Sequence, residues 1–156
     1  MSNHQMSDQG IELLMSIESF RGDPYDDQTG KVISKWVIGA TIGYGHLISL
    51  QEWNEFGAGY RNGITQEQAK TLFLKDLAPF VEGVNTKVTA SITQNQFDAL
   101  VILAFNIGLA NFATSSVLKL VNNPSALTKY PNLEAAWKSW NKSQGKIMEG
   151  LNKGRN

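Results

Sequence analysis

Two segments carry most of the information in this chain: Glu18-Ser-Phe-Arg-Gly-Asp-Pro-Tyr-Asp-Asp27 and, after thirteen intervening residues, Thr41-Ile-Gly-Tyr-Gly-His46. The first starts at the end of an apolar helical pattern and runs into residues typical of turns. The second holds two glycines between a threonine and a histidine. Two carboxylates and a hydroxyl therefore lie close together in the chain, where a helix changes to a small β region.

The helical pattern before the first segment places Glu18 on an inward face. Ser7 is a suitable N-cap, and Glu18 occupies the next position of the stripe that the apolar residues form at i, i+3 and i+4. These are Ile11, Leu14 and Met15. Burial and the negative end of the helix both disfavour ionisation, so the pKa of Glu18 should rise, as a general acid requires. The alternative is a buried glutamate paired with Arg21 or another cation.

Residues 22–47 predict a small meander of strands and turns. Glycine, Asp, Pro and Thr alternate there with Val, Ile, Tyr and Trp. Asp27 would lie in the polar part of this β region, where water and hydrogen bonds keep a carboxylate ionised. An aspartate in such a sequence is also a common Asx-turn residue, which is the competing interpretation.

Helices should dominate the rest of the chain. Capping boxes at Ser49–Glu52 and Thr65–Gln68 each predict a helix start. Thr93 can cap a thoroughly apolar helix that ends at Gly108, and such all-round hydrophobicity predicts a central, buried helix. Shorter helices are expected around 112–122, 132–142 and 148–154. The predicted fold class is α+β and mostly helical.

Composition limits the possible functions. The 156 residues suit one compact domain, and 14 basic and 14 acidic side chains give no net charge, so a nucleic-acid partner is not expected. Residues 137–156 hold five bases against Glu149, which suits either a polyanionic surface or a solvated helix face. The chain has no cysteine, which excludes disulfides and cysteine nucleophiles. The N-terminal residues lack the basic and apolar regions of a signal segment, and no apolar stretch is long enough for a membrane span, so we expect synthesis in the cytoplasm.

The two segments Glu18–Asp27 and Thr41–His46 resemble the Glu-x8-Asp and Thr-Ile-Gly-x-Gly-His signatures of phage-type lysozymes, the endolysins of glycoside hydrolase family 24. Further similarities follow in order along residues 14–155. They are Ile64-Thr65, Ala69, Leu72-Phe73, Asp76, Thr93 to Leu100, Phe105-Asn-Ile-Gly108, Phe112, Gly145-Lys, Gly150-Leu151 and Arg155. The resemblance implies a lysozyme-like fold in one domain, 1–156. A β-lobe would span about 20–60, and a helical lobe about 61–156 together with the N-terminal helix 7–20.

The resemblance also implies an activity. It is hydrolysis of the β-1,4 bond between N-acetylmuramic acid and N-acetylglucosamine in peptidoglycan, with inversion, leading to lysis of the host cell. Glu18 would be the general acid, Asp27 the base that activates water, and Thr41 a residue that holds this water. No cofactor or metal is expected, and the protein should be a monomer. After synthesis in the host cytoplasm, holin lesions would release it to the periplasm and cell wall.

Other residues are weaker candidates. We expect a structural pair of His46 and Asp76, because a single histidine without a second one nearby is weak evidence for a metal. Trp36 near the β-lobe is the tryptophan best placed to stack on a sugar, although core packing suits most tryptophans. Tyr44, Asn106 and Ser115 complete the expected substrate-binding set, with helix capping as the alternative for the last two.

The chain departs from the family in two places. Thirteen residues separate Asp27 from Thr41, where the family usually has five. A longer hairpin would absorb them without moving Asp27, since added loop length costs little. Alternatively the register shifts, and Asp26 or Asp23 becomes the base, or no carboxylate does. With Glu18 alone, a transglycosylase route would remain, and a hairpin that displaces Asp27 could also leave a module that only binds glycan. The chain also stops at Asn156, where relatives usually continue. An antibacterial effector delivered by other machinery is a further alternative to an endolysin.

Overall fold

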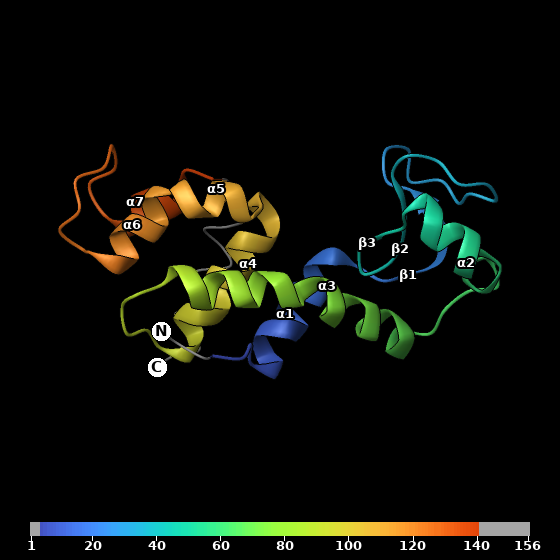
Figure 1. The fold of residues 1–156 in the computed structure, drawn as a ribbon, viewed down its shortest axis with the longest axis horizontal. Coiled ribbons are helices and arrows are strands. Elements are labelled where there is room, and N and C mark those ends of the chain that lie inside the picture. Colours follow the sequence, from blue (N-terminus) through green and yellow to red (C-terminus); the bar gives the residue numbers. More distant parts are fainter. Residues whose placement is uncertain (1–3, 141–156) are drawn as a thin grey trace. The chain divides into compact units, whose positions relative to one another are not determined.

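A computed structural model describes residues 4–140 of the chain, and Figure 1 shows the order of the elements. The strands are β1 (Arg21–Asp26), β2 (Ala40–Gly43) and β3 (His46–Leu47). The helices are α1 (Asp8–Glu18), α2 (Leu50–Arg61), α3 (Gln66–Lys87), α4 (Gln94–Ile107), α5 (Leu109–Thr114), α6 (Ser116–Asn122) and α7 (Leu133–Lys138). The expected α+β, mostly helical fold class is confirmed.

The chain forms two compact units. One contains residues 12–78, and the described part of the other contains residues 4–11 and 79–140. The boundary at 78 and 79 falls inside α3, whereas the sequence suggested a division of lobes near residue 60. No described helix is both long and apolar enough to cross a membrane.

The unit of residues 12–78 contains a three-stranded antiparallel sheet in the order β1-β2-β3. Tyr25 pairs with Thr41, and Asp26 pairs with Ala40. One face of β2 is apolar, because Ala40 and Ile42 are fully buried in a cluster with Ile48 and Trp53. Since side chains alternate along a strand, this cluster holds the register and directs Thr41 to the opposite face.

The thirteen residues between Asp27 and Thr41 fold back along β1. Gly30 N donates to Asp26 O at 2.6 Å in a tight turn, and an isolated antiparallel bridge then joins Val32 to Tyr25. Trp36 packs partly buried against the apolar cluster before the chain returns at β2. The extra residues therefore pair with the edge of β1 that β2 leaves free. The β1–β2 pairing continues to Asp26 and Ala40, and its one register shift lies between Arg21 and Tyr25.

The caps predicted from sequence are present. Ser49 accepts from Glu52 N, and Thr65 and Gln68 form both bonds of a capping box. Thr93 begins α4 with a full capping box, and Gly108 ends it at a φ of 87°. The segment expected as one helix at 112–122 is divided into α5 and α6, because Ser115 adopts an extended conformation and caps α6 with its side chain. The helix expected at 148–154 lies outside the described residues.

The second unit is built on α4, in which every residue from Phe97 to Ala104 is buried. This confirms the expected central helix. Asp98 is its one buried charged side chain. Its carboxylate accepts hydrogen bonds from Ser7 N and Ser7 Oγ, so it holds the start of α1 against α4. A Cβ on Gly10 would come within 2.7 Å of Asp98 Cγ, which explains the glycine in this turn of α1.

Candidate active site

Glu18 is the last residue of α1 and is half-buried. The helix ends there because Ser19 takes a φ of 61°, in the left-handed region. The carboxylate lies against the turn between β2 and β3, where a Cβ on Gly45 would come within 3.2 Å of Glu18 Oε2. Burial, and then the charge of Asp27, raise the pKa of Glu18 above its ordinary value. Both effects favour the protonated form that a general acid needs.

Asp27 lies just beyond β1 and is exposed. Its backbone N donates to Gly39 O at 3.0 Å, so the β1–β2 ladder continues for one more residue. The Asx turn expected as the alternative role of Asp27 is made by its neighbour, because Asp26 Oδ1 accepts from Gln28 N at 2.8 Å. Asp27 also acts on the pKa of Glu18. Asp27 is therefore the aspartate whose charge contributes to the raised pKa of Glu18.

Thr41 lies opposite Tyr25 in the ladder and is only 4% exposed. Its hydroxyl donates to Gly39 O at 2.8 Å, so the oxygen keeps its lone pairs for a donor such as water. Tyr25 and Asp27 are two residues apart and Thr41 faces Tyr25, so alternation places all three on the sheet face away from the apolar cluster. The register therefore brings Asp27 and Thr41 to the same side of the sheet.

Two residues that the sequence interpretation did not assign to the site, Arg21 and Tyr25, lie on β1, the strand that precedes Asp27. The guanidinium of Arg21 lies 4.1 Å from the ring centroid of Tyr25, and its Nη2 donates to Gly30 O at 3.0 Å. Arg21 is therefore engaged within the β region, whereas the alternative interpretation of Glu18 paired it with Arg21 or another cation. Burial, and then the charge of Asp27, raise the pKa of Tyr25. The charge of Arg21 opposes this rise, and the charge of Glu18 adds to it. The spacing Arg-x3-Tyr-x-Asp, along β1 and into the residue that follows it, was the available signal.

His46 lies between two carboxylates. Its Nδ1 is 2.7 Å from Asp76 Oδ2 on α3, and its Nε2 is 2.7 Å from Glu52 Oε2 on α2. Tyr60 also donates to Glu52 Oε2, at 2.6 Å. Burial alone would lower the pKa of His46, but hydrogen bonds to Asp76 and Glu52, with their charges, outweigh it and raise that pKa. The network joins β3, α2 and α3, and explains why Glu52 does not close a capping box at Ser49.

The structure gives Trp36 and Tyr44 packing contacts. Trp36 Nε1 donates to Ile48 O at 2.9 Å, and its ring belongs to the apolar cluster of the β region. Tyr44 is 8% exposed and packs edge-on to Phe73, with a ring centroid separation of 6.0 Å, and tilted to Phe20. Their assignment as substrate-binding residues stays a prediction.

Asn106 and Ser115 belong to the other compact unit. Asn106 is exposed and its Nδ2 donates to Ile102 O at 3.0 Å. Ser115 is 5% exposed, donates to Phe112 O at 2.8 Å and accepts from Leu118 N at 3.1 Å. The hydroxyl of Ser115 therefore makes the capping contacts considered as its alternative role, and a part for either residue in glycan binding stays a prediction.

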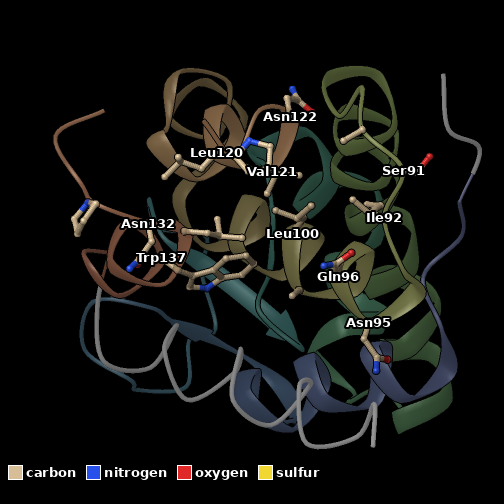
Figure 2. Close-up of a pocket in the computed structure, with 15 residues that line it drawn as sticks. Ser91, Ile92, Asn95, Gln96, Leu100, Leu120, Val121, Asn122, Asn132 and Trp137 are labelled. Atoms are coloured by element: carbon tan, nitrogen blue, oxygen red, sulfur yellow. The ribbon is translucent and has the colours of Figure 1, made fainter. Parts of the chain in front are cut away.

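The second unit also contains a cavity of about 590 Å³. Figure 2 shows its walls, to which Leu100 on α4, Leu120 on α6 and Trp137 on α7 contribute. In the described part of the chain, the side chains that line it include no titratable one. Two of its polar side chains already serve the backbone: Asn122 bonds Thr89 N and Lys87 O, and Asn132 caps α7. Among residues 4–140, no group of three His, Asp or Glu side chains could hold a metal ion.

Comparison with known proteins relates the whole chain to one family. The family model described as Phage lysozyme matches residues 15–156. The endolysin of Bacillus phage PZA is 39% identical over 151 residues, covering 94% of this chain and 50% of that protein, so the chain spans about half its length. The endolysin of Acyrthosiphon pisum secondary endosymbiont phage 1 is 32% identical over 139 residues, covering 89% of this chain and 82% of that protein. The solved muramidase domain of SpmX from Asticaccaulis excentricus has a TM-score of 0.71 and 30% identity, with 97% of each chain covered.

Proposed function

Because the chain belongs to the phage lysozyme family, we propose that it is an endolysin muramidase. Its substrate is peptidoglycan, and the bond cleaved is the β-1,4 link between N-acetylmuramic acid and N-acetylglucosamine. The relatives named endolysin and the muramidase domain of similar fold support this proposal. The observation that carries it is the contrast between a half-buried Glu18 with a raised pKa and an exposed Asp27 that contributes to that rise.

Glu18 is the general acid of the proposed reaction. Its raised pKa favours the protonated carboxyl group, and this proton passes to the glycosidic oxygen as the bond to the anomeric carbon breaks. Gly45 leaves the carboxyl group room, since a side chain there would reach it. Burial and the nearby acidic charge disfavour the carboxylate that results, so Glu18 tends to take up a proton again.

Asp27 is the proposed base. Being exposed, its carboxylate can take a proton from a water molecule while the water oxygen bonds to the anomeric carbon. Thr41 shares its sheet face and has free lone pairs to accept from that water. In an inverting enzyme the acid and base carboxyl groups are separated by about 6.5–9.5 Å, which leaves space for one water. The bond cleavage consumes one water molecule, and it leaves Glu18 deprotonated and Asp27 protonated. Release of a proton from Asp27 to solvent and uptake of one by Glu18 restore the starting states.

The test is digestion of purified peptidoglycan, followed by mass spectrometry of the products. Hydrolysis predicts hydrated muramic ends, which wild-type protein should release and Glu18→Gln should not. Anhydro ends would indicate transglycosylation by Glu18 without a base, and they would overturn the role of Asp27. Binding of chitooligosaccharide without release of reducing ends would overturn the enzymatic proposal.

The proposed biological role is lysis of a phage-infected bacterium. The enzyme would be made in the host cytoplasm and reach the cell wall through holin lesions, acting as a monomer. Expression with and without a holin tests this directly. Lysis should require the holin, and periplasmic enzyme in its absence would contradict the proposed route.

A further inference from the structure

Tyr25 carries a hydroxyl group on the sheet face that holds Asp27 and Thr41. It opposes Thr41 in the β1–β2 ladder and precedes Asp27 by two residues. Both Asp27 and Glu18 act on its ionisation, so the phenol lies within electrostatic reach of both carboxylates. The shift keeps the hydroxyl protonated throughout the range in which a muramidase would act, so it remains a hydrogen-bond donor.

Arg21 holds this tyrosine from the other side. Its guanidinium lies over the ring at 4.1 Å from the centroid, a distance typical of a cation–π contact. The same guanidinium donates to Gly30 O, in the turn that begins at Asp26. Arg21 thus joins the Tyr25 ring to the turn that contains Asp27, and the bridge from Tyr25 to Val32 adds a second link.

We propose that Tyr25 is a positioning residue for Asp27 and that Arg21 acts through Tyr25 to support it. In the complex with glycan, the Tyr25 hydroxyl donates a hydrogen bond to the Asp27 carboxylate and keeps it turned toward the attacking water. This inference rests on the proposed hydrolytic function. It adds a role for the extra hairpin, since Gly30 and Val32, which hold the Arg21–Tyr25 pair, both belong to it.

The side-chain pair suits this task better than a free tyrosine would. Asp27 is exposed, so its carboxylate needs a partner if it is to keep one orientation. The phenol of Tyr25, on β1 and two residues before Asp27, is a rigid donor, because its ring is fixed by the guanidinium and its backbone is paired on both edges. Placement of this kind matters because small errors in the geometry of reacting groups cost much of the rate.

The experiment compares Tyr25→Phe with wild type by steady-state kinetics on soluble glycan over a range of pH. The variant keeps the ring and the stacking contact and loses only the hydroxyl. A hydrogen bond to a charged group lost from the transition state predicts that kcat falls about 10- to 100-fold, with KM changed less than about two-fold. The acidic limb of the kcat profile should move to higher pH, because the carboxylate loses a donor that favours its charged form. Tyr60→Phe is the matched control: it removes a structural hydroxyl bonded to Glu52 and should leave that limb in place.

Arg21→Lys tests the second step. Lysine keeps the charge and a donor for Gly30 O but loses the planar contact with the ring, so kcat should fall, though less than in Tyr25→Phe. The double variant should be no slower than Tyr25→Phe alone, since Arg21 acts through the tyrosine. Arg61→Lys, which loses a similar contact over Trp53, should keep wild-type kcat.

The outcomes separate this inference from the proposed function. If wild-type protein releases no reducing ends, the proposed function fails and the inference with it. If wild type is active and Glu18→Gln is not, but Tyr25→Phe keeps the wild-type kcat and pH profile, only the inference is overturned. Additive losses in the double variant would overturn the action of Arg21 through Tyr25. Should Tyr25→Phe unfold, as judged by circular dichroism, Arg21→Lys still decides, because unchanged kcat and pH profile in that variant would overturn the pairing.

Discussion

Gly45 lies so close to Glu18 that a Cβ at position 45 would come within 3.2 Å of the carboxylate oxygen Oε2. The same glycine has a φ of 78°, in the left-handed region that L side chains rarely adopt. The Gly-x-Gly-His motif therefore serves two purposes in this fold. It turns the chain between β2 and β3, and it leaves room for a carboxyl group at the end of α1.

Gly45→Ala should consequently lose more activity than its stability cost explains. The strained backbone should lower the free energy of unfolding by about 1–2 kcal/mol, and displacement of Glu18 should lower kcat at least about ten-fold. Gly63→Ala is the matched control, because Gly63 also has a positive φ, of 93°, but its Cβ would meet only ordinary contacts. Urea unfolding measures the free energy of unfolding of each variant, and turnover of peptidoglycan measures its kcat. Equal kcat in the two variants would contradict a spatial role of Gly45 beside Glu18.

Asp27→Asn should lower the pKa of Glu18. After burial, the charge of Asp27 is the second cause that raises this pKa, so its removal leaves burial alone. An NMR titration of the Glu18 carboxyl carbon measures the change. Asp26→Asn is the matched control, since the Asp26 carboxylate accepts from Gln28 N and is not among the causes of the Glu18 shift. A larger effect of Asp26→Asn would assign the facing carboxylate to Asp26 and restore the shifted-register alternative.

Glu18→Gln should abolish lysis and stabilise the protein at neutral pH. A group with a raised pKa in the folded state contributes stability that is present below its unfolded pKa and is lost as pH rises through the folded value. At pH 7 the wild type therefore bears the cost of a half-buried charge near Asp27, and glutamine does not. The melting temperature of Glu18→Gln should exceed that of wild type at pH 7 and match it near pH 3. A lower melting temperature at pH 7 would contradict the raised pKa.

The His46 network should make stability depend on pH in the opposite direction from acid unfolding. The pKa of His46 is raised in the folded state, so the stabilisation is complete below the unfolded value of about 6.5 and is lost as pH rises through the folded pKa. Urea unfolding between about pH 5 and 9, a range that brackets the unfolded pKa of histidine, measures this loss. His46→Gln should flatten the profile of stability against pH over this window. Asp76→Asn should reduce its slope, because it removes the hydrogen bond that raises the pKa of His46 most. A slope unchanged in His46→Gln would assign the pH dependence to other groups.

Much of the fold was predictable from local patterns. The capped starts of α2, α3 and α4 follow from a hydroxyl residue with a glutamate or glutamine three positions later, and the buried α4 follows from its uninterrupted apolar residues. The resemblance to phage-type lysozymes is confirmed along nearly the whole chain. The division of the expected helix at 112–122 was missed, because a serine inside a helical pattern gives little warning that its hydroxyl will cap a new helix.

The amino-acid sequence by itself determined the helices and their caps, the small β region, the membership in a lysozyme family and the choice of Glu18 as candidate acid. These depend on periodicity, capping and motif order, which are local properties of the chain. Only the tertiary structure decided that the charge of Asp27 acts on the pKa of Glu18, that Glu52 joins Asp76 on His46, and that Arg21 lies over the ring of Tyr25. Each of these depends on strand register and on helices meeting across long sequence separations, and a register is set by the burial of Ala40 and Ile42 against residues distant in the chain.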